Sequence, residues 1–160
     1  MKNAVYLAGP MEDVSTDHMK GWRSAAADAL NWAGIAVLDP TRRISLHDQL
    51  YSVEDKNDGI WLKSKADALE RSVVSSSICN RIFKQDLQDI AESKIVLADV
   101  RRDSGRGTGT SMELMFAHTK NKIIILWANK DDLIHPFYEA MYSEKHYSID
   151  EAIEAAMEYY

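Results

Sequence analysis

Two apolar runs with no polar alternation constrain the fold of this chain more than any other feature of its sequence. They are KIVLADV at 94–100 and KIIILW at 122–127, and nearly every residue between their charged ends is hydrophobic. A strand with one face in water alternates apolar and polar residues, because successive side chains point to opposite faces. Runs without alternation are instead typical of strands in a parallel sheet that helices cover on both faces.

The rest of the chain places further strands and helices around these two runs. The run AVYLA at 4–8 ends at Gly9-Pro10, which predicts a buried strand followed by a turn. The other expected elements are strands at 35–39 and 145–148, helices at about 17–33, 80–92, 110–120 and 149–160, and a short helical piece opening at His135-Pro136. This alternation predicts a single doubly wound α/β domain over 1–160, flavodoxin-like or Rossmann-like, with a parallel sheet of four or five strands.

Residues 41–79 do not follow that alternation. They are polar and mixed, and they include a serine tract at 75–77. We expect a short helix around Ile60–Arg71 and interpret the whole segment as an insertion in the domain or as a flap over an active site.

Charge and cysteine content exclude several classes of function. The net charge is −6, and no stretch gathers lysine and arginine on a long face, which disfavours a nucleic-acid polymer or an anionic membrane as partner. Cys79 is the only cysteine and the histidines lack tight ligand spacing, so we expect no disulfide, metal or cofactor. No apolar run is long enough for a signal peptide or a membrane span, which makes a cytoplasmic protein the default expectation.

The stretch GRGTGTSMELMFAH at 105–118 resembles a phosphate-binding loop but matches neither standard motif. A P-loop requires a lysine that is missing here, and the dinucleotide motif requires G-x-G-x-x-G after the first strand. Gly105, Gly107 and Gly109 instead run as G-x-G-x-G after the third strand. Two interpretations of this stretch remain. It is either an ordinary flexible turn before a helix, or a helix N-terminus whose unpaired N–H groups favour an anion or an oxygen-rich ligand. Hydroxyl groups are supplied there by Thr108, Thr110 and Ser111.

Glu113 is the one carboxylate in the apolar part of this stretch. Its spacing from Thr110 fits a capping box, in which it would serve only the helix terminus in the first turn. Its neighbours Met112 and Leu114 favour a partly desolvated carboxylate in a pocket instead. In parallel sheets ligands bind beyond the carboxyl ends of the strands, an edge that collects Gly9-Pro10, Asp39 and residues 99–110. The companion carboxylates expected near this edge are Asp86, Asp89, Asp99 and Asp103, and their convergence would favour acid–base or covalent chemistry.

Four stretches of the chain together resemble the nucleoside 2-deoxyribosyltransferase family. They are VYLAGPM at 5–11, QDLQDIAESKIVLADV at 85–100, GTSMELMFAH at 109–118, and IHPFYEAM at 134–141 followed by SIDEAIE at 148–154. Their order and spacing cover most of the chain apart from 41–79. The resemblance departs from the family pattern at Gly107, because several members have an aspartate six residues before their nucleophile.

This resemblance implies an enzyme that moves 2-deoxyribose between nucleobases in nucleoside salvage. Glu113 would be the nucleophile that attacks C1′, Asp86 would handle the proton of the base, and Tyr6 would hold Glu113. Substrate would be bound by Gly9, Pro10, Asp99, Ser104, Gly107, Gly109, Thr110 and Tyr138. The implied partners are a small nucleoside or nucleotide and a free base, in a homo-oligomer whose sites are completed by a neighbouring subunit, with Tyr138 as the candidate donor.

Two other functions stay open. One is a nucleoside 5′-monophosphate N-glycosidase on the same scaffold, in which water accepts the sugar and hydroxyl groups bind the phosphate. It is favoured by the hydroxyl-rich run with Arg106. The other is a non-catalytic module that senses nucleotides at the same edge of the sheet.

Overall fold

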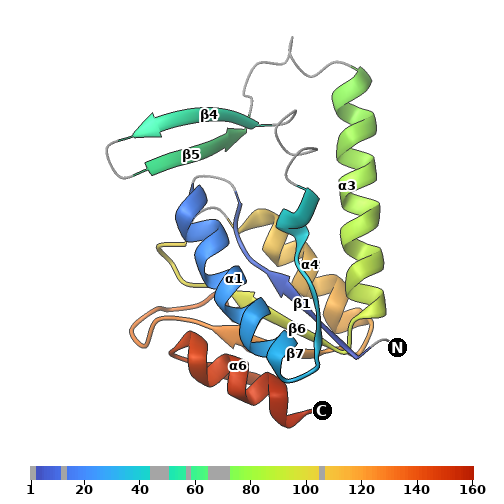
Figure 1. The fold of residues 1–160 in the computed structure, drawn as a ribbon, viewed down its shortest axis with the longest axis vertical. Helices are drawn as coiled ribbons and strands as arrows, with labels where there is room; N and C mark the ends of the chain where they lie inside the picture. The colour runs from blue at the N-terminus through green and yellow to red at the C-terminus, as the bar shows by residue number, and fades with distance from the viewer. Residues whose placement is uncertain (1–2, 12–13, 44–50, 57–58, 65–72, 105–106) are drawn as a thin grey trace.

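A computed structural model describes residues 3–11, 14–43, 51–56, 59–64, 73–104 and 107–160. Its centre is a five-stranded sheet in the order β3-β1-β6-β7-β8, in which every neighbouring pair is parallel (Figure 1). The strands are β1 (Ala4–Ala8), β3 (Ala36–Leu38), β6 (Ile95–Asp99), β7 (Ile123–Trp127) and β8 (Glu144–His146). The predicted α/β fold is therefore confirmed, with five strands.

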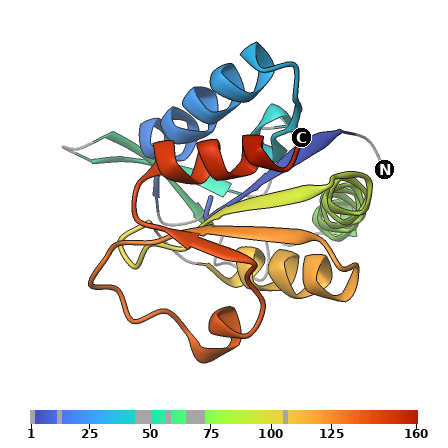
Figure 2. The same cartoon turned by 90° about the horizontal axis from the view of Figure 1, so that it is seen from below.

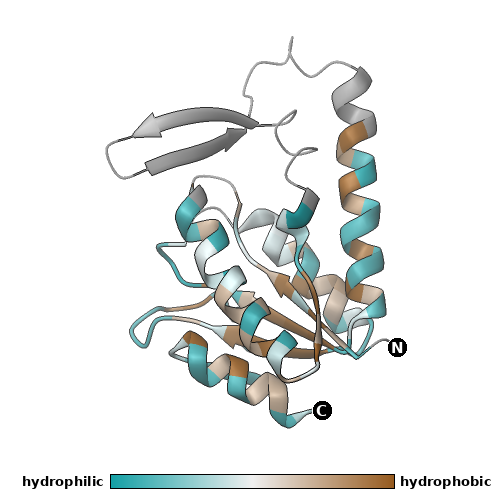
Figure 3. Ribbon diagram, in the orientation of Figure 1, coloured by the Kyte–Doolittle hydropathy of each residue, from teal (hydrophilic) through white to brown (hydrophobic). Residues whose placement is uncertain are grey.

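Helices cover both faces of this sheet. The helices α1 (Thr16–Trp32) and α6 (Ile149–Glu158) lie on one face, and α3 (Val73–Glu92) and α4 (Thr108–Thr119) lie on the other (Figure 2). Every residue of β1 and β6 is buried, and the hydropathy colouring shows these strands as an apolar centre (Figure 3). The three central residues of β7, 124–126, are buried as well, and this burial on both sides explains why the two long apolar runs, which form β6 and β7, carry no polar alternation.

Alternation along β1 assigns its side chains to two separate cores. Val5 and Leu7 pack with Trp22 of α1, whereas Tyr6 and Ala8 pack with Leu114 of α4. Successive residues of a strand point to opposite faces, so one short strand contributes to both helical layers. The carboxyl end of β1 is consequently the place where side chains from α1 and α4 can act on the same groups.

Local sequence explains where several helices begin and end. The hydroxyl of Ser15 accepts a hydrogen bond from the His18 N–H at the start of α1, and Ser148 does the same for Glu151 at the start of α6. Gly34 follows α1 with a φ of 79°, the left-handed conformation that glycine adopts without strain. The short helix α5 (Pro136–Glu139) begins at His135-Pro136, as expected.

The expectation of a helix around Ile60–Arg71 is wrong for its first part. Residues Gly59–Ser64 form a strand, β5, that pairs with β4 (Tyr51–Lys56) and with β2 (Val14–Ser15) in a small antiparallel sheet. The run Ile60-Trp61-Leu62 begins with a β-branched and an aromatic residue, which both favour strands. The remainder, 65–72, lies outside the described residues.

The helix expected at 80–92 is longer than the sequence pattern indicated. The structure begins α3 at Val73, so the serine tract at 75–77 is helical. Serine weakens a helix only modestly, and residues from Ile82 onward anchor the apolar face that fixes the element. Between Pro40 and Arg43 the chain forms a short 3-10 helix, η1. Among the helices of the described residues, none combines the length and apolar character needed to cross a membrane.

Candidate active site

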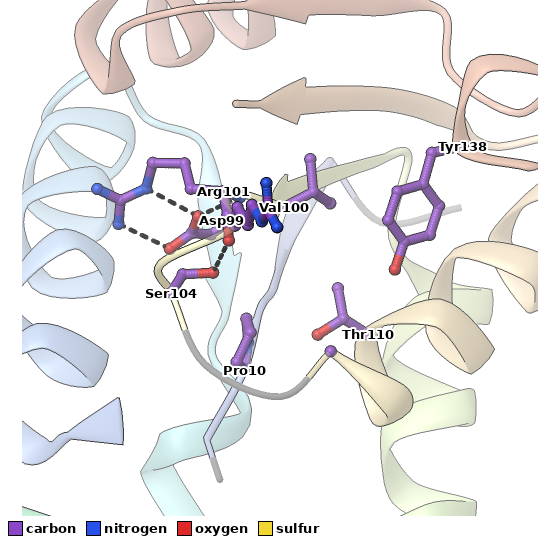
Figure 4. Close-up of a pocket in the computed structure, with 9 residues that line it drawn as sticks. Pro10, Asp99, Val100, Arg101, Ser104, Thr110 and Tyr138 are labelled. Atoms are coloured by element: carbon purple, nitrogen blue, oxygen red, sulfur yellow. Dashed lines mark hydrogen bonds and ion pairs between the residues drawn. The ribbon is translucent and has the colours of Figure 1, made fainter. Parts of the chain in front are cut away.

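A pocket of about 170 Å³ lies where β1 and β6 end and α4 begins. Figure 4 shows the Asp99–Arg101 pair on one side of it and Thr110 and Tyr138 on the other. Its lining consists of Pro10, Asp99, Val100, Arg101, Arg102, Ser104, Gly107, Thr110 and Tyr138. Most of the substrate-binding residues predicted from the sequence are thus gathered at one edge of the sheet. Gly9 and Gly109 are not among the lining residues.

Glu113 lies on α4 one helical turn beyond Thr110, which lines the pocket; Glu113 itself is not among the lining residues. Residues three apart share a face of a helix and are separated by a rise of about 4.5 Å along its axis. The hydroxyl of Tyr6 on β1 donates a hydrogen bond of 2.6 Å to Oε1 of Glu113. Tyr6 is fully buried, and its ring packs in the core beneath α3 and α4. Its hydroxyl is therefore fixed in position and orients the Glu113 carboxylate through this hydrogen bond.

The surroundings of Glu113 make it a weaker acid. Its pKa is raised from 4.5 to about 7: burial is the main cause and the charge of Asp86 adds to it, while the Tyr6 hydrogen bond and the charge of Arg23 partly offset the rise. Burial, followed by the charge of Glu113, also raises the pKa of Tyr6 well above 10. Tyr6 therefore stays protonated and donates to the carboxylate. A carboxyl group poised near neutral pH is typical of catalytic sites.

Replacement of Tyr6 by phenylalanine is expected to raise the pKa of Glu113 by about one unit, because the hydrogen bond to the ionised form is lost. The measurement is the ¹³C NMR titration of the Glu113 side-chain carboxyl, assigned by its absence in Glu113→Gln. Tyr142→Phe is a matched control, since that tyrosine hydrogen-bonds to the exposed Glu139. An unchanged or lower pKa in Tyr6→Phe would contradict the assigned role of the hydrogen bond.

The interpretation of Glu113 as a capping-box residue is wrong. The helix α4 has Gly107 as its N-cap, with no side-chain cap hydrogen bond, which makes Thr110 the third helical residue. Glu113 therefore lies beyond the first turn, and its carboxylate accepts from Tyr6 of another element rather than from its own helix terminus. The helix starts at Thr108, two residues earlier than the expected residue 110.

The carboxylates expected to converge with Glu113 are mostly bound elsewhere. Asp89 pairs with Arg42 of η1 at 2.5 Å, and the exposed Asp103 accepts from the Asn129 side chain. Asp99 is held by Arg101. Asp86 on α3 is the carboxylate whose charge acts on both Glu113 and Tyr6. Of the four companion carboxylates, only Asp86 thus acts on the pKa of Glu113, and Asp99 lines the pocket paired with Arg101.

One wall of the pocket is a charged cluster that sequence reasoning missed. Arg101 makes two hydrogen bonds of 2.9 Å with the two carboxylate oxygens of Asp99, and its guanidinium stacks at 3.5 Å over the ring of Trp127. A ring nitrogen of His18 lies 2.9 Å from the same guanidinium. Arg101 is the second residue after β6, and this position is the sequence signal that could have placed it at this edge. The cluster holds the Asp99 side chain in place and pairs its negative charge with the positive charge of Arg101.

The opposite wall is built from α4 and α5. The hydroxyl of Ser111 donates to the Gly107 carbonyl at 2.8 Å and lies 2.6 Å from the Tyr138 hydroxyl. Thr110 is 3% exposed, and its hydroxyl has no hydrogen-bond partner among the residues that the structure describes. Figure 4 shows that hydroxyl directed toward the open space of the pocket. Tyr138 lines the pocket of its own chain, whereas the resemblance implied a role in a neighbouring subunit.

A buried hydroxyl without a partner is costly, because its hydrogen bonds to water are lost and not replaced. Such a group at a helix N-terminus, with Arg102 also lining the pocket, indicates a ligand rich in oxygen atoms. Among the described residues no cluster of histidine, cysteine, aspartate and glutamate has the composition of a metal site.

Comparison with known proteins shows similarity at the level of the fold. No protein-family model and no curated protein matches the chain. A 2-deoxyribosyltransferase from the psychrotolerant bacterium Bacillus psychrosaccharolyticus superposes with a TM-score of 0.63 and 19% identity, over 96% of this chain and 95% of that enzyme. A CMP N-glycosidase from Clostridium botulinum superposes with a TM-score of 0.53 and 13% identity, over 95% and 96%. The chain therefore shares the fold of enzymes that act on N-glycosidic bonds.

Proposed function

We propose that this chain is an enzyme that breaks the N-glycosidic bond of a 2′-deoxynucleoside and transfers the sugar to a second base through Glu113. The observation that carries the proposal is the Glu113 carboxyl group, which is partly desolvated, held by Tyr6 at 2.6 Å and poised with a pKa near 7. It stands one turn from a pocket whose polar groups suit a sugar. The shared fold supports the same class of substrate but carries no residue roles by itself.

In the first step an ionised Glu113 oxygen attacks C1′ and forms an ester with the sugar. The bond between C1′ and the base nitrogen breaks, its electron pair stays on the base, and the base takes up one proton. Positive charge develops on the sugar in an oxocarbenium-like transition state, which a carboxylate at C1′ stabilises before it bonds. We assign the donation of this proton to the protonated form of Asp86, which becomes ionised as the base leaves; its electrostatic coupling to Glu113 supports its place beside the site.

In the second step a nitrogen of another base attacks the same carbon from the vacated side. The ester bond to Glu113 breaks, the carboxylate is regenerated, and the incoming base loses its proton. Two displacements at one carbon retain the configuration and divide one difficult reaction into two easier ones. Tyr6 keeps the free oxygen of Glu113 in place throughout, because its raised pKa keeps the hydroxyl protonated.

The pocket beside Glu113 would hold the part of the substrate remote from the reacting carbon. The unpaired Thr110 hydroxyl supplies one hydrogen bond to it, and the wall opposite is fixed by Asp99 and Arg101. Gly107 stands where the resemblance led us to expect an aspartate, so that position presents backbone rather than a carboxylate. Whether a second subunit completes the site stays a prediction.

Replacement of Thr110 by valine is expected to raise KM by about tenfold while the folded chain keeps or gains stability. The substitution removes the hydroxyl that awaits a ligand and also removes an unpaired buried polar group, which costs roughly 1 kcal/mol or more in the free protein. Steady-state kinetics and thermal unfolding measure the two effects. Thr119→Val serves as a control on the same helix, because the Thr119 hydroxyl donates to Phe116 far from the pocket. An unaltered KM in Thr110→Val would remove this residue from the binding site.

A second candidate is hydrolysis of a nucleoside 5′-monophosphate. It is favoured by the N-terminus of α4 together with Arg102, which would suit a phosphate group at the same pocket. Arg106, which the sequence also suggested for this purpose, lies outside the described residues. In this reaction water would replace the second base as acceptor and free sugar phosphate would be released.

Product analysis decides between these functions. Deoxyinosine and thymidine, and the corresponding monophosphates, are incubated with and without a second base, and exchanged nucleoside and free sugar are both quantified. Base exchange with the nucleosides supports transfer, whereas hydrolysis of monophosphates alone contradicts it. Binding without any turnover, unchanged in Glu113→Ala, would instead favour a nucleotide-sensing module.

A further inference from the structure

Arg23 on α1 is a buried cation that the proposed chemistry does not yet use. Its side chain is 0% exposed, and it is the one buried side chain among the lysines and arginines whose exposure the structure describes. Burial of a charged side chain costs several kcal/mol unless it is paired and hydrogen-bonded. Its partners therefore indicate why the fold retains it.

The guanidinium of Arg23 holds the carboxyl end of β1. Its Nη2 donates to the Gly9 carbonyl and its Nη1 to the Met19 carbonyl, both at 2.7 Å, and its Nε reaches the Leu7 carbonyl at 3.5 Å. Leu7 and Gly9 flank the end of the strand that carries Tyr6. A side chain from the α1 layer thus fixes the backbone on which the Glu113 hydrogen-bond donor is mounted.

The charges around Arg23 come from both helical layers and from the strand ends. Asp39, just after β3, lies 3.8 Å from its Nε, and Asp99, Glu113 and Tyr6 also act on it electrostatically. Asp99 is already paired with Arg101. Burial lowers the pKa of Arg23, and the charges of Asp39 and Glu113 oppose that effect, so the guanidinium remains a cation at neutral pH.

We propose that Arg23 is a positioning residue of the candidate site, which fixes the end of β1 and supplies the positive charge that balances ionised Glu113 across the sheet. Asp39 is its second partner. When Glu113 becomes an ester its charge disappears, and Asp39 then keeps Arg23 paired. The two carboxylates thus hold the cation in both states of the reaction cycle. Any effect of Arg23 on the reaction rate rests on the proposed function, whereas its effect on the ionisation of Glu113 does not.

The test is the ¹³C titration of the Glu113 carboxyl in the free protein, where no turnover is required. Arg23→Gln removes the charge and is expected to raise the pKa of Glu113 by about one unit. Arg23→Lys keeps the charge but loses donors, and its titration is expected to stay closer to that of the parent. Asp39→Asn frees the charge of Arg23 to act on Glu113 and is expected to lower the pKa. Arg42→Gln is the control, because Arg42 pairs with Asp89 instead.

Opposite shifts in Arg23→Gln and Asp39→Asn support the proposal, because a purely structural role would not reverse sign between them. Equal upward shifts in Arg23→Gln and Arg23→Lys overturn the role of the charge, as does a parent-like titration in Asp39→Asn. Asp39 is partly exposed and Asn retains its hydrogen bond from the Thr41 N–H, so this variant decides the question even where the Arg23 variants do not fold. If the parent protein shows no base exchange while the variants show the expected pKa shifts of Glu113, the result counts against the proposed function and not against the role of Arg23.

Discussion

Glu113→Gln is expected to lower kcat by at least about 10³-fold and to abolish any covalent sugar adduct. The amide keeps the size of the side chain and can still accept the Tyr6 hydrogen bond, but it cannot displace a base from C1′. Removal of the acting nucleophile in enzymes with covalent intermediates costs losses of this order or larger. Intact-protein mass spectrometry after rapid acid quench measures the adduct, and steady-state assays measure kcat.

Glu139→Gln provides the matched control for this variant. Glu139 also accepts a tyrosine hydrogen bond, from Tyr142 at 3.0 Å, but it is exposed and paired with Lys145. It should retain full turnover. An adduct that persists in Glu113→Gln, or turnover near that of the parent, would assign the nucleophile to another residue. Loss of turnover with no adduct in the parent would indicate a direct displacement by water.

The same variant tests the ionisation of Glu113 through stability. The folded-state pKa is about 7 against 4.5 for a glutamate exposed to water, so folding favours the protonated form. The ionised carboxylate therefore destabilises the parent increasingly from pH 4.5 to pH 7 and by a constant amount above. The upper bound is about 3 kcal/mol, less solvent screening of a partly exposed side chain. Glu113→Gln should unfold at a higher temperature than the parent at pH 8, and the difference should vanish near pH 4.

The parallel sheet was predictable because each of its central strands can be recognised from its own run of apolar residues, without knowledge of its partners. KIVLADV and KIIILW require cover on both faces wherever they lie in a chain, and the turn at Gly9-Pro10 ends the first strand locally. The region 41–79 was harder to interpret, since β4 and β5 pair with each other and with β2, far away in the sequence. Strand propensity depends on such partners more than helix propensity does.

The candidate site was predictable to the extent that it follows strand ends. Asp99, Ser104 and Thr110 line the pocket because the sequence places them just after β6 or at the next helix. The roles of Arg101 and Arg23 were not predictable from spacing. Each is defined by contacts across elements: the stacking of Arg101 on Trp127, and the reach of Arg23 from α1 to the end of β1. Only the three-dimensional arrangement shows which cation neutralises which carboxylate.

Gly9→Ala is expected to destabilise the fold by about 1–3 kcal/mol and to lower kcat/KM by about tenfold or more. A Cβ at this position would lie 3.0 Å from Nη2 of Arg23, 3.0 Å from the Trp22 ring and 3.3 Å from Cβ of Asp99. Arg23 cannot move aside without losing its bond to the Gly9 carbonyl, and Asp99 is held by Arg101. The strain must therefore displace groups that fix the pocket.

Gly21→Ala is the matched control for this substitution. Gly21 is exposed within α1, and a Cβ there would meet nothing within 4 Å. Alanine has the higher helix propensity, so this variant should gain roughly 0.5–1 kcal/mol of stability with unaltered kinetics. Chemical denaturation and kcat/KM, measured where both variants are folded, separate the effects. If Gly9→Ala had the same free energy of unfolding and the same kcat/KM as the parent, the close packing of Arg23, Trp22 and Asp99 against Gly9 would not be needed for the stability of the fold or the geometry of the site.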